Sequence, residues 1–319
     1  LNSWGGRVQE YAHSIAFRNI DGLNLGKLYD VDPCGDSFYF NATDNVKAEF
    51  LSSTSSEDCG RNGVSIIDGD YMEFDTIIST NIGVAGMPGG FDIEPNKGDH
   101  VSNVTVHNAI IHSIATGFQV SNAYGEYSSI KDIDITAHVT RAHASRNLSS
   151  FANIFQGITK GSANSVFDIT TVQNEVSDGA VIIRCDGIEL EMNISNSDRG
   201  LYIIDSQNFV VTGSINDTVD GSVHFATYGT GDTTSNGVIN MTLKNSDRDN
   251  EGRYGAIYNQ GGTVLNNITF SGDYSKDVTA ANGIRNEGTM VNCKLVNLDL
   301  SGFSDENVIT GNGSTNITD

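Results

Sequence analysis

Ten short apolar runs recur along the chain, and each is opened by a glycine or, in one case, by a phenylalanine. The successive openings are 28, 27, 27, 34, 28, 21, 21, 34 and 28 residues apart. A repeat of this length is typical of a stacked solenoid, in which every repeat buries its apolar face against its neighbours. The openings are Gly35, Gly63, Gly90, Gly117, Phe151, Gly179, Gly200, Gly221, Gly255 and Gly283.

Apolar and polar residues alternate after each opening and again in a second run of each repeat, as in Val101–Val106 and Ile130–Ile135. Such alternation predicts strands with one buried face, and no helical segment separates the runs. We therefore predict an all-β fold, a parallel β-helix of about ten coils, with residues 1–319 forming a single elongated domain. The inward ladder is predicted to contain Phe38, Val64, Phe91, Phe118, Ala180, Leu201, Ser222, Ala256 and Ile284.

The charge and the hydropathy pattern exclude several functions. The formal net charge is −22, whereas nucleic-acid binding needs clustered Lys and Arg, so we expect no nucleic-acid partner. The same charge weakly disfavours a dense polyuronate substrate. No apolar run reaches the roughly 18 residues of a membrane span, so we expect no membrane insertion. No leader precedes Leu1, and we expect a fragment of a longer chain.

Two carboxylates in the third repeat are the candidates for catalysis. If Phe91 and Ile93 point into the core, Asp92 and Glu94 both point outward from one strand. Two strand positions place such carboxylates about 5 to 9 Å apart, which covers both retaining and inverting glycosidase geometries. Carboxylates this close push their pKa values apart, which leaves one as the acid and the other as base or nucleophile. The alternative is that both are ordinary solvated residues of an acidic protein.

The residues around this pair carry a resemblance to a known family. The run Arg61–Ile66, with Asp92–Asn96 one coil later, resembles the R-N-G-[IV]-S-[IV] and G-[IF]-D-I-E-P-N segments of pectate-lyase-like β-helix proteins. Many of these are bacteriophage tailspikes that depolymerise bacterial capsular or other surface polysaccharide. The resemblance implies a right-handed β-helix, homotrimeric assembly, a location on the phage tail and cleavage of a bacterial glycan. The family includes both hydrolases and lyases.

Five further residues are candidates for binding substrate. Stacked coils would place Ser65 and Gln119 beside Asp92, with Tyr39 one coil further toward the N-terminus. Arg61 lies near the same corner, where it would pair with a carboxylate, bind an acidic sugar or brace a turn. Saccharides need polar partners and an aromatic face. Tyr124 and Tyr127, in a long loop, are expected to supply that face or else to cover the wall.

Metal and cofactor motifs are weak in this sequence. The seven histidines form no H-x-x-x-H or H-E-x-x-H set. Asp247–Gly252 copies the first half of a calcium loop, but Tyr258 stands where the bidentate glutamate belongs. We therefore expect no metal and no cofactor. The cysteines form no C-x-x-C pair, and we expect buried free thiols, with a Cys34–Cys59 disulfide as the alternative.

From these inferences we predict that the chain is a tailspike-type depolymerase that binds and hydrolyses a bacterial surface polysaccharide. Asp92 and Glu94 are the expected catalytic pair. A polysaccharide lyase is the nearest alternative, with Lys97 or Arg61 as the base that removes a proton from a uronic acid. The other alternative is a receptor-binding or adhesin β-helix that holds glycan without cutting it.

Overall fold

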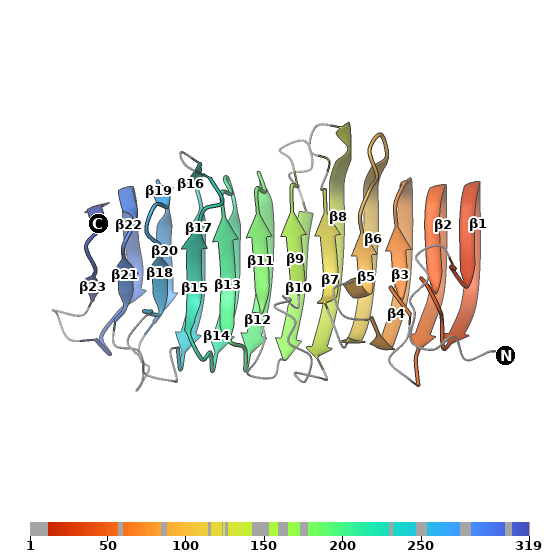
Figure 1. The fold of residues 1–319 in the computed structure, drawn as a ribbon, viewed down its shortest axis with the longest axis horizontal. Helices are drawn as coiled ribbons and strands as arrows, with labels where there is room; N and C mark the ends of the chain where they lie inside the picture. Colours follow the sequence, from red (N-terminus) through yellow and green to blue (C-terminus); the bar gives the residue numbers. More distant parts are fainter. Residues whose placement is uncertain are drawn as a thin grey trace. The chain divides into compact units, whose positions relative to one another are not determined.

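The structure described below is a computed structural model, in which regular structure consists of strands (Figure 1). The residues it describes contain no α-helix, and so no helix long and apolar enough to cross a membrane. The paired strands run parallel, as between β2 and β4 or β13 and β15. The predicted all-β class is confirmed, with parallel sheets. The described residues are 12–56, 60–83, 88–113, 116–122, 124, 127–141, 153–158, 165–172, 178–229, 232–246, 254–274, 282–303 and 308–318.

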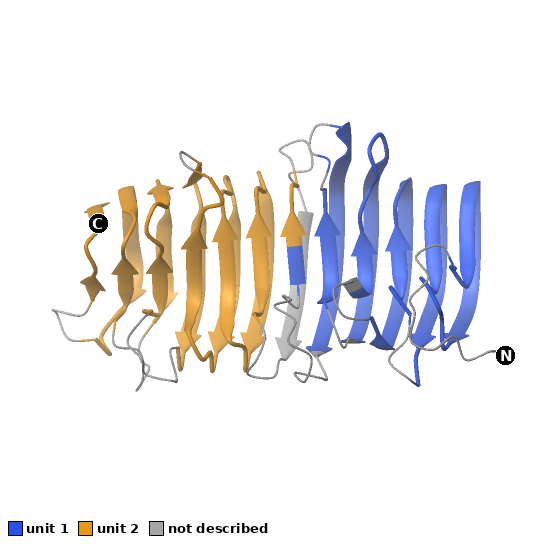
Figure 2. Ribbon diagram, in the orientation of Figure 1, with its two compact units in different colours: residues 1–154, 164–169 blue, residues 155–163, 170–319 orange. Residues whose placement is uncertain are grey.

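The chain divides into two compact units (Figure 2). Unit 1 comprises residues 1–154 and 164–169, and unit 2 comprises residues 155–163 and 170–319. Strands β9 (Asn153–Gln156) and β10 (Ser165–Val172) each contain residues of both units. The single elongated domain expected from the repeat stays a prediction.

Unit 1 is built on two parallel ladders. The longer strands pair in the order β1–β2–β4–β6–β8. The shorter strands pair in the order β2–β3–β5–β7, so β2 belongs to both ladders. The strands are β1 (Ile15–Val31), β2 (Phe38–Thr54), β3 (Val64–Ile66), β4 (Gly69–Ile82), β5 (Pro88–Ile93), β6 (His100–Ser113), β7 (Thr116–Ser121) and β8 (Ser129–Arg141).

The core of the short-strand ladder is the predicted inward column. Phe38, Val64, Phe91 and Phe118 are aligned by the pairing, and each is at most 1% exposed. The rings of Phe91 and Phe118 stack with their centroids 5.2 Å apart. Gly90 allows this close approach of backbones, because a Cβ there would lie 2.1 Å from Ile111 and 2.5 Å from a carbonyl oxygen of the next strand.

Unit 2 contains three parallel ladders. Their orders are β11–β13–β15–β18–β21–β23, β12–β14–β17–β20–β22–β24 and β16–β19–β22. The strands are β11 (Ala180–Ile183), β12 (Ile188–Ser195), β13 (Arg199–Ile204), β14 (Val210–Asn216), β15 (Gly221–Ala226), β16 (Thr233–Ser235), β17 (Val238–Lys244), β18 (Ile257–Asn259), β19 (Val264–Asn266), β20 (Thr269–Asp273), β21 (Ile284–Asn286), β22 (Thr289–Asp299), β23 (Ile309–Thr310) and β24 (Ser314–Thr318).

The inward ladder predicted for unit 2 is wrong by one residue at two positions. Leu201 is aligned with Val223, and Val223 with Ile257, instead of with Ser222 and Ala256. The reason is that the tight corner accepts a serine or an alanine as well as a glycine, as at Ser222 and Ala256. Ser222 occupies the corner, where its hydroxyl lies 2.6 Å from a second buried serine hydroxyl, so the opening glycine falls one residue earlier than the pattern assumes.

An asparagine column explains part of the polar composition of unit 2. Asn208, Asn236 and Asn267 have φ values of 53°, 53° and 57°, the left-handed conformation that asparagine tolerates better than most residues. The Asn236 amide donates to Asn208 Oδ1 at 3.2 Å, and the Asn267 amide donates to Asn236 Oδ1 at 3.0 Å. The side chains therefore continue the strand pairing around a corner.

The cysteines agree only in part with the expectation of buried thiols. Cys185 and Cys293 are buried free thiols, but Cys34 is an exposed one. Cys34 lies in the turn before β2, outside the alternating pattern, which is why burial of the neighbouring strand does not extend to it. Cys59 lies outside the described residues.

Candidate functional site

An outward column of side chains crosses the short-strand ladder of unit 1. Tyr39, Ser65, Asp92 and Gln119 are aligned on β2, β3, β5 and β7. Phe91 and Ile93 are completely buried on either side of Asp92 in the sequence, and successive side chains of a strand point to opposite faces. The predicted neighbours of Asp92 are therefore confirmed.

Asp92 lies on the predicted outward face, but water does not reach it, so the alternative of two ordinary solvated carboxylates is wrong for Asp92. Asp92 is 0% exposed and Glu94 is half-buried. The cause is a layer of polar side chains on this face: Asn62 donates from Nδ2 to Asp92 Oδ2 at 3.4 Å, and Arg61 and Asp36 lie close enough to act on the Asp92 charge. Alternation predicts the face on which Asp92 lies, but not whether water reaches it.

Asp36 is a third carboxylate of this cluster, and the sequence pattern does not indicate it. Its side chain is completely buried. Asp36 Oδ2 lies 3.1 Å from His13 Nδ1 and 3.7 Å from Arg61 Nη1. The His13 ring in turn stacks on Tyr39, with centroids 4.0 Å apart. Asp36 lies at the corner before β2, where the alternation of inward and outward side chains stops. Its alignment with the corner residue Asn62 is the one signal that would have identified Asp36 as a member of the cluster.

The electrostatics of the cluster favour a neutral Asp92. Burial raises the pKa of Asp92 well above its usual range, and the charges of Glu94 and Asp36 raise it further. Arg61 and Gln119 act on this pKa in the opposite direction and do not cancel the shift. Asp92 is accordingly a carboxylic acid that keeps its proton far above the pH at which an exposed aspartate loses it.

Several buried polar atoms of the cluster have no hydrogen-bond partner among the described residues. These are Asp92 Oδ1, Asn62 Oδ1 and Ser65 Oγ. Buried polar groups in proteins are nearly always paired, and an unpaired one costs roughly 1–3 kcal/mol. Asp92 Oδ1 and the two unpaired atoms beside it therefore mark a place where a ligand rich in hydroxyl groups would form hydrogen bonds with the protein.

The predicted substrate-binding residues lie in two places. Arg61, Gln119 and Tyr39 belong to the cluster around Asp92, and Arg61 pairs with Asp36 rather than with the predicted carboxylates. Tyr124 and Tyr127 are 46% and 55% exposed between β7 and β8. There the Tyr127 carbonyl accepts a hydrogen bond from the Gly98 amide, and Lys97 Nζ lies 4.6 Å from its ring centre.

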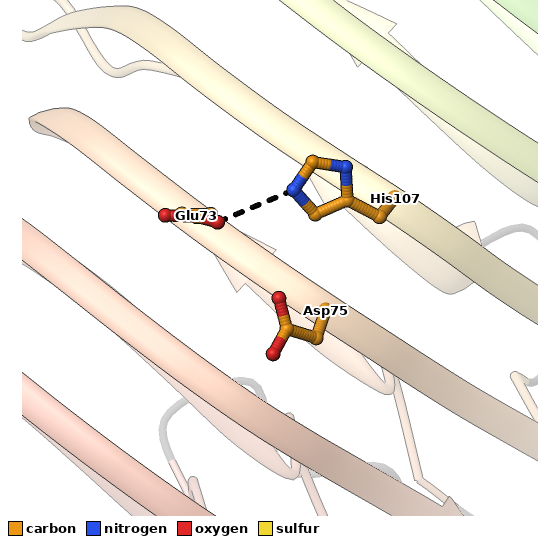
Figure 3. Close-up of side chains that lie close together, drawn as sticks. All are labelled: Glu73, Asp75 and His107. Carbon is orange, nitrogen blue, oxygen red and sulfur yellow. Dashed lines mark hydrogen bonds and ion pairs between the residues drawn. The ribbon is translucent and has the colours of Figure 1, made fainter.

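A separate group of metal-ligand types lies on the long-strand ladder (Figure 3). Glu73 and Asp75 of β4 and His107 of β6 place their ligand atoms within 4.8 Å of one another. His107 Nε2 lies 3.3 Å from Glu73, and Lys47 Nζ lies 3.4 Å from the same carboxylate. We assign no metal to these side chains, because Glu73 and Asp75 are partly exposed, His107 is exposed, and Glu73 is already paired with a cation. Asp247–Gly252 lies outside the described residues.

Comparisons with known proteins return no match: no family model, no curated protein and no solved structure is similar to this chain. The resemblance to β-helix depolymerases therefore depends on Arg61–Ile66 and Asp92–Asn96 alone. In the structure these two segments are adjacent, since β3 pairs with β5 and aligns Ser65 with Asp92.

Proposed function

We propose that the chain is a tailspike-type depolymerase that binds a bacterial surface polysaccharide and hydrolyses its glycosidic bonds. The observation that supports this most is Asp92, a completely buried carboxyl group beside the charge of Glu94, with its pKa raised well above the usual range. A carboxylic acid that holds its proton to a higher pH than usual, next to a second carboxylate, is suited to glycoside hydrolysis.

In the proposed reaction Asp92 is the general acid. Its carboxyl proton passes to the glycosidic oxygen as the bond to the anomeric carbon breaks. Glu94, two residues further along the chain, either attacks the anomeric carbon or removes a proton from the attacking water, since the spacing of about 5 to 9 Å fits both. Asp36, held by His13 and Arg61, acts through Asp92 by raising its pKa.

Entry of the sugar requires movement of the side chains around Asp92, because Asp92 has no exposed surface in this structure. Arg61 is one member of the surrounding layer that reaches the surface, with its side chain 15% exposed. We propose that displacement of Arg61 from Asp36 opens the cluster and lets sugar hydroxyls pair with Asn62 and Ser65.

The finer features of the proposal concern the fold and the assembly. Parallel ladders whose side chains stay in register over successive strands support a parallel β-helix of about ten coils. The right-handed sense, the homotrimer and the location on a phage tail, outside the cell, follow from the resemblance. Light scattering gives the mass of the assembly in solution, and a mass other than three chains contradicts the trimer.

The activity test uses a panel of purified bacterial capsular and O-chain polysaccharides. The wild-type chain is expected to release reducing ends from at least one of them. Asp92→Asn and Glu94→Gln are each expected to lower this rate about 10²- to 10⁴-fold, the usual contribution of a general acid or base. Asp134→Asn, which removes an exposed carboxylate of β8, is the matched control and should cleave at the wild-type rate.

The same assay separates the alternatives. Products with the ultraviolet absorbance of an unsaturated uronic acid identify a lyase. Binding of a polysaccharide without cleavage identifies a glycan-binding protein. Cleavage that survives in both Asp92→Asn and Glu94→Gln contradicts the assignment of the catalytic pair.

A further inference from the structure

An aromatic column lies on the outward face of unit 2, in a part of the chain that the carboxylate site does not use. We define the aromatic column as Tyr202, His224 and Tyr258 together with Tyr254. The first three are aligned by the pairing of β13, β15 and β18. The His224 ring centre lies 5.0 Å from Tyr202, 5.0 Å from Tyr254 and 5.6 Å from Tyr258.

The column points away from the core and keeps part of its surface open. Leu201, Val223 and Ile257 precede Tyr202, His224 and Tyr258 in the sequence and are completely buried, so the aromatic residues lie on the other face. His224 is 2% exposed and lies beneath the rings, while the three tyrosines are partly exposed. The planes of Tyr254 and Tyr258 are inclined at 49° and 73° to the imidazole, so the rings do not form a closed stack.

Among the described residues, the two arginines beside the column are paired within the protein. Arg199 donates from Nε and Nη2 to the two Asp178 oxygens at 2.6 and 2.9 Å. Arg285 donates to Glu287 Oε1 from Nε at 3.0 Å and from Nη2 at 2.6 Å. Burial lowers the pKa of His224 to about 3, with a smaller effect from Arg199, so its imidazole is neutral. The surface therefore combines ring area with hydrogen-bonding groups and offers no unpaired cation within the aromatic column.

We propose that the aromatic column is a binding site for a neutral saccharide chain. Aromatic rings flanked by a few fixed polar groups match a ligand that has both apolar C–H faces and hydroxyl groups. An acidic glycan is disfavoured, because both arginines are paired and the whole chain carries a formal net charge of −22. This site shares its ligand class with the proposed function, but it binds sugar whether or not Asp92 cleaves it.

The Tyr258 side chain is the best residue for a test. Its hydroxyl donates to Glu287 Oε2 at 2.8 Å, and its ring contacts both His224 and Tyr254. Tyr258→Ala removes the ring, and Tyr258→Phe keeps the ring but loses the hydroxyl. Tyr228→Ala is the matched control, because Tyr228 is an exposed tyrosine of unit 2 that lies outside the aromatic column.

The experiment measures binding to an immobilised array of neutral and acidic bacterial polysaccharides. We expect the wild-type chain to bind at least one neutral polysaccharide, Tyr258→Ala to weaken that binding at least about tenfold, and both Tyr258→Phe and Tyr228→Ala to change it less than about threefold. Oxidative footprinting of the wild-type chain should show that the bound polysaccharide protects Tyr258 and not Tyr228, which keeps the test valid if Tyr258→Ala does not fold.

Three results overturn the proposal. They are binding to acidic polysaccharides only or to none, unchanged binding by a folded Tyr258→Ala chain, and protection of neither Tyr254 nor Tyr258 in the footprint. The Asp92→Asn chain distinguishes this site from the catalytic one. If Asp92→Asn binds the array normally but does not cleave, the proposed binding site at the aromatic column is supported independently of cleavage. If Asp92→Asn still cleaves, only the assignment of Asp92 as a catalytic residue is wrong.

Discussion

Replacement of Asp92 by asparagine should change the pH dependence of stability in a defined direction. The folded-state pKa of Asp92 is raised well above its ordinary value of 3.8, chiefly by burial and then by Glu94. Between the unfolded and folded pKa values the folded chain holds a proton that the unfolded chain has lost. Unfolding then releases one proton, so the stabilising contribution of Asp92 is complete below about pH 4 and is lost as pH rises toward the folded pKa.

The magnitude follows from a single proton. The free energy of unfolding of the wild-type chain should fall, relative to Asp92→Asn, by about 1.4 kcal/mol per pH unit across this window. The substitution also places an amide where Asp92 Oδ1 now lies without a partner. That exchange adds an offset of roughly 1–3 kcal/mol that does not depend on pH, so the slope and not the offset is diagnostic.

The assay is urea unfolding at a series of pH values from 4 to 8 for the wild-type, Asp92→Asn and Glu94→Gln chains. In Glu94→Gln one of the charges that raise the Asp92 pKa is absent, so the folded-state pKa of Asp92 is lower. The decrease of the unfolding free energy with pH should therefore end at a lower pH than in the wild-type chain. Asp134→Asn controls for removal of one exposed carboxylate. Curves for wild type and Asp92→Asn that stay parallel, or that diverge with the opposite sign, would show that Asp92 is ionised in the folded chain and refute the general-acid assignment.

Three further predictions test the packing. Phe91→Ala should destabilise the chain by about 3–5 kcal/mol in urea unfolding, because Phe91 is completely buried on Phe118; a smaller loss means a loosely packed core. Tyr274→Phe should raise the urea midpoint and stabilise by about 1–3 kcal/mol, because the buried Tyr274 hydroxyl has no partner among the described residues; a lower midpoint contradicts this. A thiol reagent at pH 8 should label Cys34 in the folded chain but Cys185 only after unfolding, since burial raises the pKa of Cys185 to about 12; equal labelling rates contradict the burial.

The all-β class with parallel sheets and one column of the site could be predicted from the sequence because they depend on periodicity. Alternation identifies Phe91 and Ile93 as core residues, and the spacing of the glycines aligns Ser65, Asp92 and Gln119. Both inferences need only the two-residue period of a strand and the length of one repeat. They fail where a different small residue fills the corner, as Ser222 does.

The remainder of the site could not be predicted because it depends on corners and on solvent access. Asp36 and Asn62 lie just before strands, where side-chain direction no longer alternates. Asn62 donates a hydrogen bond to Asp92, and Asp36 raises the pKa of Asp92. The aromatic column was missed for another reason. Tyr202, His224 and Tyr258 are separated by steps of unequal length, and only the strand register shows that they are neighbours.

The outward positions of the two units show that paired strands with similar inward residues can have outward side chains of different chemical types. In unit 1 the residue that follows inward Phe91 is an acid, whereas in unit 2 the residues that follow inward Leu201 and Ile257 are tyrosines. Core packing and strand hydrogen bonds depend on the inward residues and the backbone, so an outward residue can change while its ladder persists. A substitution at the partly exposed Tyr258 should therefore report on ligand chemistry more than on folding, whereas a substitution at the completely buried Asp92 also changes the stability of the chain.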